Sequence, residues 1–554
     1  MIRRRWSALP AAFAVTVLAA CTSSSTAATE HSADQSSGSV QSSAQGSAPS
    51  AESAAPMNPA AAPGVPANDV WIGSAIRKID GLAASMQEQT NIPGMAVAVV
   101  HDGQIVFAKG YGVREVGQPE PVDANTVFQL ASLSKPIGAT VIAQEVGKGT
   151  VAWDTPLITH LPEFALADPY VTQNVTIADM YSHRSGLPDH AGDLLEDLGY
   201  DRAYVLSKLK YEPLEPFRAI YHYTNFGITA GAESVARATG VDWETLSERD
   251  IYGPLGMSNT SSTFADFEAN PDRAVGHVLV DGAYQAKYVR QPDAESPAGG
   301  VSSSVTDVAT WLAMVLNEGT TADGTQLVDP AALNAALTPH MRSVEGSLIP
   351  PSITGRAGFY GYGFNVGNDA TGRVRIGHSG AFGLGAGTTF LGIPDLNLGI
   401  VVLTNAAPIG AAEALSQEFA DLAEFGSIQH DWRPIYAGAF AAGSDPVGSL
   451  AGQTAPANPA PAAANSAYVG TYQNDYVGPA TVSESGGGLV LTLGPDNQQF
   501  PLTHWDGQVF TMVPTGENAP DGSISAVTFE TTGETASTMT IEFYNKEGLG
   551  VYRR

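Results

Sequence analysis

Residues 68–430 combine short apolar runs, typical of strands, with longer stretches in which the apolar residues follow helical spacing. Two apolar runs flank Asp102-Gly103, a dipeptide that typically closes a β-hairpin. Strands are expected at residues 94–100, 104–113, 360–366, 373–380 and, as a pair around Pro394-Asp395, within 381–405. Helices are expected at residues 71–87, 137–146, 175–181, 226–240, 311–316 and 411–425. The pattern predicts a large domain of mixed helices and strands.

Residues 466–554 have a different pattern of short alternating strands separated by Gly and Asp turns. This pattern is typical of an antiparallel sheet or a small β-barrel. Four of its aromatic residues could line a ligand pocket or pack in a core, and the core is the simpler interpretation: Tyr472, Trp505, Phe510 and Phe543.

The first residues are typical of a bacterial export signal. Three arginines precede an apolar stretch that ends in Leu-Ala-Ala-Cys at Cys21. Residues 1–21 therefore resemble a lipoprotein signal with Cys21 as the lipidated residue, the alternative being an ordinary signal peptide. The expected location is the bacterial cell envelope, with the protein held on the membrane through Cys21.

Two segments have linker composition. Residues 22–67 consist mainly of Ser, Ala, Gln, Pro and Gly, and residues 431–465 contain a second Pro/Ala/Gly-rich stretch. We expect the first to tether the large domain, and the second to join it to the C-terminal β domain.

Composition limits the possible partners. The net charge is −29 and no Lys/Arg cluster occurs in the body of the chain after the signal, so nucleic acid is not an expected partner. Cys21 is the one cysteine in 554 residues, which excludes an internal disulfide.

The most distinctive chemical motif is Ser132-x-x-Lys135. If this stretch opens a helix, both side chains share one face and the amine can reach the hydroxyl. Serine needs a neighbouring base to become a nucleophile, and a desolvated lysine can be that base. A second serine-x-x-lysine, Ser207 to Lys210, lies in an amphipathic polar stretch and is interpreted as a surface helix face.

A second pair of polar residues is Tyr223 and Asn225. Two residues apart in an extended segment, they project to the same side. A tyrosine near a cationic lysine can have a lowered pKa and transfer protons, and an asparagine amide can hold both the lysine and a substrate carbonyl. Spacing alone does not distinguish this pair from Tyr472 and Asn474.

Other candidate residues have ordinary structural explanations. We interpret His183 as satisfying the backbone of a Gly-rich turn, and His190 as lying near the rim of a cleft. Ser303 and Ser304 could be nucleophiles, but a helix cap with Asp307 in the first turn is the simpler interpretation.

The ordered set Ser132/Lys135, Tyr223/Asn225 and His378-Ser379-Gly380 resembles the serine β-lactamase and penicillin-binding-protein superfamily, in its class C-like branch of esterases and D-amino-acid peptidases. The resemblance covers residues 70–425. It implies an α/β (α+β) domain with an antiparallel sheet flanked by helices plus a helical subdomain. The C-terminal part resembles a lipocalin-like β domain.

The resemblance also implies roles for individual residues. Ser132 would form an acyl-enzyme, with Lys135 and Tyr223 as the general base pair. The backbone N–H groups of Ser132 and Ala381 would form the oxyanion hole. Asn225 would orient the substrate, and the remaining substrate-binding residues would be His378, Ser379 and Gly380. No metal and no cofactor are implied.

His378 stands where many relatives carry a lysine. Because histidine is a weaker and pH-dependent anion site, ester or D-amino-acid amide substrates are favoured over efficient β-lactam hydrolysis. If protonated His378 held a substrate carboxylate, activity on anionic substrates would fall as the pH rises through about 6.5 to 7.5.

The sequence thus predicts a surface-anchored serine hydrolase for small ester, peptide or lactam substrates. The alternative is a lipoprotein that binds penicillin or a cell-wall fragment without catalysis.

Overall fold

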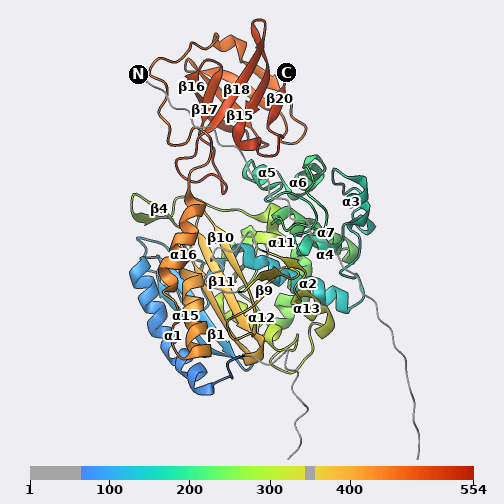
Figure 1. Ribbon diagram of the computed structural model, residues 1–554, viewed down its shortest axis with the longest axis vertical. Helices are drawn as coiled ribbons and strands as arrows, with labels where there is room; N and C mark the ends of the chain where they lie inside the picture. Colours follow the sequence, from blue (N-terminus) through green and yellow to red (C-terminus); the bar gives the residue numbers. More distant parts are fainter. Residues whose placement is uncertain (1–63, 344–355) are drawn as a thin grey trace, which may run out of the picture. The chain divides into compact units, whose positions relative to one another are not determined.

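The computed structural model describes residues 64–343 and 356–554 (Figure 1). The large domain contains an eight-stranded antiparallel sheet with strand order β2-β1-β12-β11-β10-β9-β8-β7. Its strands are β1 (Gly94–His101), β2 (Gln104–Gly112), β7 (Met341–Arg342), β8 (Gly358–Tyr360), β9 (Asn365–Asn368), β10 (Val374–Phe382), β11 (Ala386–Ile393) and β12 (Leu398–Thr404). Two small two-stranded sheets pair β3 (Val127–Gln129) with β6 (Ser302–Ser304) and β4 (Val278–Val280) with β5 (Ala283–Gln285).

The predicted hairpin is confirmed. Strands β1 and β2 pair antiparallel, and the turn residues Asp102 and Gly103 have φ of 51° and 71°. Both values lie in the left-handed region that the short hairpin turn requires, which explains the Asp-Gly dipeptide.

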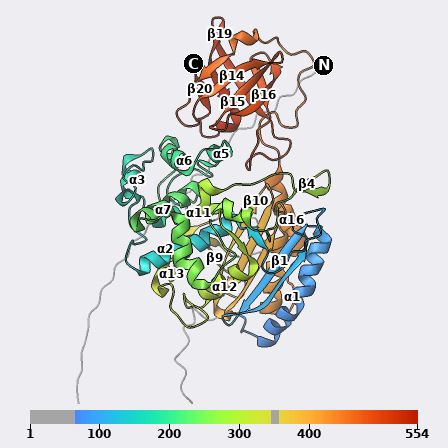
Figure 2. The same cartoon turned by 180° about the vertical axis from the view of Figure 1, so that it is seen from behind.

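Alternation along β1 assigns its side chains to two cores. Met95, Val97 and Val99 belong to the hydrophobic cluster under α1 and α15, whereas Ala96, Ala98 and Val100 belong to the cluster that includes α12. The strand is buried on both faces because helices cover both sides of the sheet (Figures 1 and 2).

The helices of the large domain cover the sheet or form a helical subdomain beside it. They are α1 (Asp69–Thr90), α2 (Ser134–Gly147), α3 (Pro169–Asn174), α4 (Ile177–Tyr181), α5 (Asp193–Asp197), α6 (Arg202–Lys208), α7 (Asn225–Thr239), α8 (Trp243–Ser247), α9 (Gly253–Leu255), α10 (Phe264–Ala269), α11 (Ser296–Gly299), α12 (Val305–Leu316), α13 (Pro330–Ala336), α15 (Ala411–Phe425) and α16 (Trp432–Ala441). The predicted fold class of this domain, an antiparallel sheet flanked by helices with a helical subdomain, is confirmed.

The predicted linker at 431–465 begins too early, because residues 432–441 form helix α16, whereas residues 445–464 contain no helix or strand. Helix α16 packs on α15 and buries Trp432 and Tyr436, and the indole N–H of Trp432 donates to Asp421 at 2.7 Å. The Ala and Gly residues of this segment suggested a linker, yet aromatic residues four apart lie on one helix face and anchor it.

The first linker prediction, 22–67, falls almost entirely outside the described residues. Its last four residues are described, and there the backbone N–H of Gly64 donates to Thr371 and the carbonyl of Val65 accepts from Arg373. The Asn68 side chain then caps helix α1 by accepting from Val70 and Trp71.

The C-terminal domain is an eight-stranded antiparallel meander, as its alternation predicted. Its strands are β13 (Gly470–Tyr472), β14 (Ala480–Ser485), β15 (Gly488–Leu493), β16 (Gln498–Asp506), β17 (Val509–Met512), β18 (Ser525–Thr532), β19 (Thr535–Ile541) and β20 (Val551–Arg553). Gln473 and Arg553 exchange two backbone hydrogen bonds of 2.7 and 3.0 Å, which join the first and last strands into a barrel.

The aromatic residues of the barrel mostly form its core. Tyr472 and Phe510 are buried and pack with Tyr468 and Phe529, whereas Trp505 and Phe543 are only partly buried. The core interpretation therefore holds for Tyr472 and Phe510, the two residues inside the barrel.

The barrel and the large domain belong to one compact unit, residues 60–554. The side-chain amide of Gln498 donates to the carbonyl of Asp197 at 2.8 Å, and the ammonium of Lys208 donates to the carbonyl of Asp475 at 2.6 Å. The buried hydroxyl of Tyr476 also donates to the carboxylate of Glu212. The barrel thus contacts the segment around α5 and α6.

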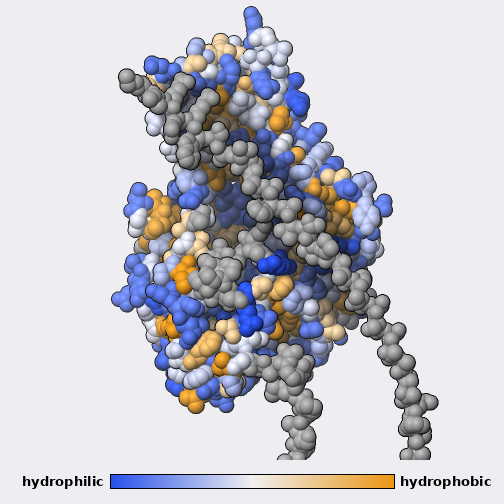
Figure 3. Space-filling model, viewed as in Figure 1, coloured by the Kyte–Doolittle hydropathy of each residue, from blue (hydrophilic) through white to orange (hydrophobic). Residues whose placement is uncertain are grey.

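Hydrophilic residues cover much of the molecular face drawn in Figure 3, and apolar residues occur there in small groups. Within the part of the chain that the structure describes, no helix combines the length and the apolar character needed to span a bilayer.

Candidate active site

Ser132 lies in a short 3-10 turn, Ala131–Leu133, immediately before helix α2. Lys135 is in the first turn of α2, and its Nζ lies 3.0 Å from the Ser132 Oγ. Pro136 follows within that turn, where its missing N–H costs no helix hydrogen bond. The predicted serine–lysine contact therefore exists, although only the lysine belongs to the α-helix.

The residue before the serine has a strained backbone. Ala131 has φ of 49°, in the left-handed region that alanine rarely adopts. Such positions occur at functional sites, where the surrounding structure holds a side chain in a required direction.

The Lys135 amine is fully buried and has three neighbours. Besides Ser132 Oγ, its Nζ lies 2.7 Å from Asn225 Oδ1 and 2.9 Å from the Ala298 carbonyl. The two carbonyl oxygens can only accept hydrogen bonds. A neutral amine would use its two N–H bonds for them and direct its lone pair to the serine.

Burial lowers the pKa of Lys135 to about 8, although the carboxylates of Glu295 and Asp193 oppose this shift. A substantial fraction of the amine is then neutral near physiological pH. This satisfies the requirement for a general base that accepts the serine proton.

Tyr223 completes the arrangement around the serine. Its hydroxyl donates to Ser132 Oγ at 2.7 Å, and Lys135 Nζ lies 4.6 Å from its ring centroid. Burial raises the pKa of Tyr223 well above its ordinary value. The prediction of a lowered tyrosine pKa was therefore wrong, because desolvation outweighs the hydrogen bond to Ser132. The phenol stays protonated and acts as a donor.

Asn225 connects the lysine to residues that the sequence did not assign to the site. Its side-chain Nδ2 donates to Asp193 Oδ2 at 2.9 Å, and the same oxygen lies 2.8 Å from His190 Nδ1. Only the placement of His190 near a cleft rim was expected. Asp193 occurs in the same loop, but nothing in its spacing indicates the contact.

His183 has the structural role predicted for it. Its Nδ1 accepts from the backbone N–H of Thr224 at 3.1 Å, and its ring packs against Tyr223 with centroids 4.6 Å apart. Burial lowers its pKa well below the ordinary value. The neutral imidazole therefore helps to hold the ring of Tyr223 in place.

His378 is a neutral residue in this structure. Its Nδ1 lies 2.7 Å from the Ser379 carbonyl and must carry the proton, so Nε2 accepts from the hydroxyl of Tyr360 at 2.8 Å. Burial, followed by the charge of Lys135, lowers the pKa of His378 to about 3. The prediction that His378 loses a positive charge, and with it an anion site, as the pH rises from 6.5 to 7.5 was therefore wrong. The imidazole is already neutral throughout that range.

Strand β10 passes directly beside the serine. A Cβ at Gly380 would lie 2.2 Å from the Leu130 carbonyl and 3.2 Å from the Ser132 backbone nitrogen. Only glycine permits this approach. The next residue, Ala381, is exposed and lines the same cavity as Ser132, where the two backbone N–H groups were expected to bind an oxyanion.

The cavity has a volume of about 930 Å³. It brings together residues from all three motif-bearing segments and from other elements far apart in the chain. Its lining includes Ser132, Tyr223, Asn225, His378, Ser379, Ala381, Asp193, Glu295 and Glu517.

The alternative motifs, Ser207 to Lys210 and Tyr472 to Asn474, have structural roles. The Ser207 hydroxyl is exposed and donates to the carbonyl of Tyr204, and Tyr472 donates to the carbonyl of Tyr468 inside the barrel. Ser304 caps α12 by accepting from the backbone N–H of Asp307, as predicted.

Cys21 lies outside the described residues. Among residues 64–343 and 356–554, no group of three or more His, Cys, Asp or Glu side chains could hold a metal ion.

Comparison with known proteins agrees with this geometry. Residues 79–423 match the family model named Beta-lactamase, and residues 454–549 match a domain of unknown function (DUF3471). Penicillin-binding protein 4 of Amycolatopsis lactamdurans is 29% identical, over 58% of this chain and 83% of that protein. The D-alanyl-D-alanine-carboxypeptidase/endopeptidase AmpH of Escherichia coli K12 is 25% identical, over 59% of this chain and 83% of that protein.

The unguisins hydrolase ungD of Aspergillus violaceofuscus is 28% identical over 57% of this chain and 58% of that protein. The chain spans about half the length of this and other curated relatives that it matches.

A solved structure, the octameric penicillin-binding protein homologue from Pyrococcus abyssi, matches with a TM-score of 0.56 and 20% identity over 84% of this chain and 98% of that chain. This likeness supports the fold. Because the family model spans more than half of its residues, the chain belongs to the beta-lactamase family.

Proposed function

We propose that this protein is a serine hydrolase that forms an acyl-enzyme on Ser132 and acts on esters or on amides and peptides of D-amino acids. The observation that carries the proposal is the position of Lys135, whose amine is buried 3.0 Å from the serine hydroxyl and held by two carbonyl acceptors. An amine held in this way has its lone pair available for the serine proton.

The reaction follows from these contacts. The Ser132 oxygen attacks the substrate carbonyl carbon while its proton passes to the neutral Lys135 amine. The carbonyl oxygen becomes an oxyanion, which the N–H groups of Ser132 and Ala381 stabilise. When the bond to the leaving group breaks, Lys135 returns the proton to it, and Tyr223 provides a hydrogen bond to the serine oxygen throughout.

Hydrolysis of the acyl-enzyme reverses these roles. Water attacks the ester carbonyl and loses a proton to Lys135. The bond between the carbonyl carbon and Ser132 Oγ then breaks, Lys135 returns the proton to Oγ, and the acid leaves. No other reactant is needed.

The substrate class is inferred from His378 and from the relatives. A neutral imidazole that is bonded to Tyr360 and Ser379 lacks the permanent charge of a lysine, so strong binding of the carboxylate of a β-lactam is not expected here. The name of AmpH includes D-alanyl-D-alanine carboxypeptidase activity, and that of ungD includes hydrolase. The name of AmpH supports peptides of D-amino acids as a substrate class, and that of ungD supports hydrolysis.

The test is a parallel assay of the purified full chain with p-nitrophenyl butyrate, D-alanine p-nitroanilide and a chromogenic cephalosporin. Turnover of the ester or the anilide should exceed that of the cephalosporin. Ser132→Ala should abolish it, and the matched control Ser207→Ala should retain it. Binding of these compounds without turnover would instead support a non-catalytic binder, and equal loss in both variants would exclude Ser132 as the nucleophile.

We also propose that the protein is held on the cell envelope by a lipid on Cys21. The Leu-Ala-Ala-Cys sequence after an apolar segment supports this location. Cells that express the protein should incorporate a labelled fatty acid into it, and Cys21→Ser should remove both the label and the membrane association. Label retained in Cys21→Ser would contradict the proposal.

A further inference from the structure

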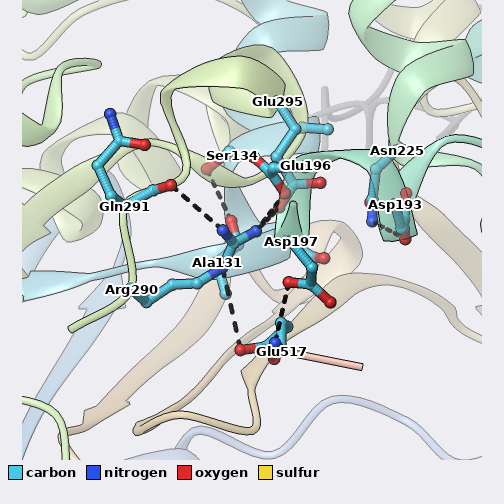
Figure 4. Close-up of polar contacts among 12 residues, drawn as sticks. Ala131, Ser134, Asp193, Glu196, Asp197, Asn225, Arg290, Gln291, Glu295 and Glu517 are labelled. Carbon is cyan, nitrogen blue, oxygen red and sulfur yellow. Dashed lines mark hydrogen bonds and ion pairs between the residues drawn. The ribbon is translucent and has the colours of Figure 1, made fainter. Parts of the chain in front are cut away.

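Four carboxylates gather on one wall of the cavity that contains Ser132: Asp193, Glu196, Glu295 and Glu517. Figure 4 shows them around Arg290, with Asp193 beside Asn225. The first three come from the large domain and the fourth from the barrel. The proposed reaction uses none of them.

Arg290 pairs with part of this cluster. Its guanidinium lies 2.6 Å from Glu196, 2.8 Å from Glu295 and 3.9 Å from Glu517. Its side chain is 9% exposed, so these pairs are shielded from solvent. The guanidinium does not reach Asp193 with any hydrogen bond or ion pair found in the described residues.

Three buried oxygen atoms of the cluster remain without a hydrogen-bond partner among the described residues. They are Asp193 Oδ1, Glu196 Oε1 and Glu295 Oε2. The side chains that carry them are 7%, 6% and 4% exposed. Buried carboxylate oxygens nearly always accept hydrogen bonds, so this wall is suited to a ligand that brings N–H donors.

The position of Asp193 relates the wall to the reacting atoms. Its other oxygen accepts from Asn225, and Asn225 in turn accepts from Lys135. Asp193 is thus two hydrogen bonds away from the proposed general base, on the side where Asn225 was expected to orient the substrate.

The barrel completes the wall. Glu517 lies in the segment between β17 and β18, and its carboxylate accepts from the backbone N–H groups of Gly383 and Leu384 in the turn after β10. Asp197 in turn accepts from the backbone N–H groups of Glu517 and Asn518 at 2.9 and 3.1 Å. The β domain therefore contributes directly to the edge of the substrate cavity.

We propose that Asp193, Glu196 and Glu295, with Glu517 at the edge, form a subsite for a protonated amine on the acyl part of the substrate. An ammonium has three N–H donors, which match the three unpartnered acceptor oxygens of Asp193, Glu196 and Glu295. The substrate class is then a D-aminoacyl ester or amide with a free amine. This inference rests on the proposed function and narrows it.

The test compares D-alanine p-nitroanilide with its N-acetyl derivative, in which the amine is neutral. With the full chain near pH 7, we expect kcat/KM for the free amine to exceed that for the acetylated compound at least tenfold. Glu196→Gln and Glu295→Gln should each reduce this ratio severalfold, because an amide keeps the shape but replaces one acceptor oxygen by an N–H donor.

Glu212→Gln is the matched control. Glu212 is also a buried glutamate with one unpartnered oxygen, but it contacts Tyr476 and does not line the cavity. Its variant should keep the wild-type ratio. An equal reduction in the control would overturn the assignment of the subsite.

An inhibition measurement that needs no variant of the carboxylates covers the case in which those variants fail to fold. D-Alaninamide should inhibit p-nitrophenyl butyrate hydrolysis competitively and more strongly than N-acetyl-D-alaninamide. If the ester is hydrolysed through Ser132 while both amides inhibit equally, the subsite is excluded and the proposed function stands. If Ser132→Ala changes no turnover, the proposed function itself fails.

Discussion

At the scale of single residues, the site consists of three side chains whose charge states are set by burial. Lys135 is buried among carbonyl acceptors, so its neutral form is accessible. Tyr223 and His378 are buried as well, and desolvation keeps each of them neutral. The lysine is therefore the group of the three that can exchange a proton near physiological pH.

This assignment predicts the pH dependence of hydrolysis of an uncharged ester. The base must be deprotonated, and the pKa of Lys135 is about 8. For p-nitrophenyl butyrate, kcat/KM should therefore rise about tenfold per pH unit between pH 6 and 7.5 and reach a plateau above pH 8.5. The profile should show no step from His378, and a fall over this range would contradict the role of the lysine.

Tyr223→Phe removes one hydrogen bond and leaves the ring. Because the hydroxyl donates to Ser132 Oγ, kcat/KM should fall by roughly 10²- to 10⁴-fold. The Tm should change little, since the ring still packs against His183. Steady-state kinetics and thermal unfolding of the same preparation check both statements, and unchanged kinetics would remove the tyrosine from the mechanism.

At the scale of elements, the site depends on the close approach of β10 to the turn that carries the serine. The Ser132/Lys135 contact was predictable because it is local, at three residues' separation. The other residues around Ser132, such as Tyr223 and Gly380, could be predicted only from the order of the family motifs along the sequence. They reach Ser132 through the packing of elements that are distant in the chain.

Gly380→Ala tests this packing. The added Cβ would lie 2.2 Å from the backbone carbonyl of Leu130, so β10 or the serine turn must shift. We expect a loss of activity of at least tenfold and a destabilisation of about 1–3 kcal/mol. Gly367→Ala in β9 is the control, since nothing lies within 4 Å of the Cβ that an alanine would place there, and both quantities should stay near wild type. Matching behaviour of the two variants would contradict the role of Gly380.

Helix α16 illustrates the limit of composition. Residues 431–465 are rich in Ala, Gly and Pro, and this average hides Trp432, Ile435 and Tyr436, which lie on one face of a helix. These side chains pack against hydrophobic residues of α15, and this packing stabilises the helix. Such tertiary contacts cannot be predicted from the neighbouring sequence alone.

At the scale of the whole molecule, two domains that were recognisable from their patterns meet at the substrate cavity. The contribution of Glu517 was unpredictable, because it lies 385 residues after Ser132 and belongs to no motif. The same holds for Arg290 and Glu295, whose charges matter only once folding has brought them together.

Buried carboxylates should also make stability depend on pH. Burial raises the pKa of Glu295 and Glu413 to about 7 and that of Glu517 to about 8. Between their ordinary and raised pKa values, the folded state holds protons that the unfolded state has lost, so stability falls as pH rises.

This fall in stability should be clearest between pH 6.5 and 8. Buried imidazoles such as His378 make stability rise with pH, but only below about pH 6.5. Differential scanning calorimetry should give a lower Tm at pH 8 than at pH 6.5. A Tm that rises over this window would show that the carboxylates are not buried in the way the structure indicates.

The central claim is that Ser132 carries the acyl group and that Lys135 activates it. The most direct measurement is rapid acid quench of the full chain during p-nitrophenyl butyrate turnover, followed by intact mass spectrometry and peptide mapping. We expect the mass of one butyryl group on the peptide that contains Ser132, absent in Ser132→Ala and strongly reduced in Lys135→Ala. An acyl group on another residue, or full acylation in Lys135→Ala, would contradict the account.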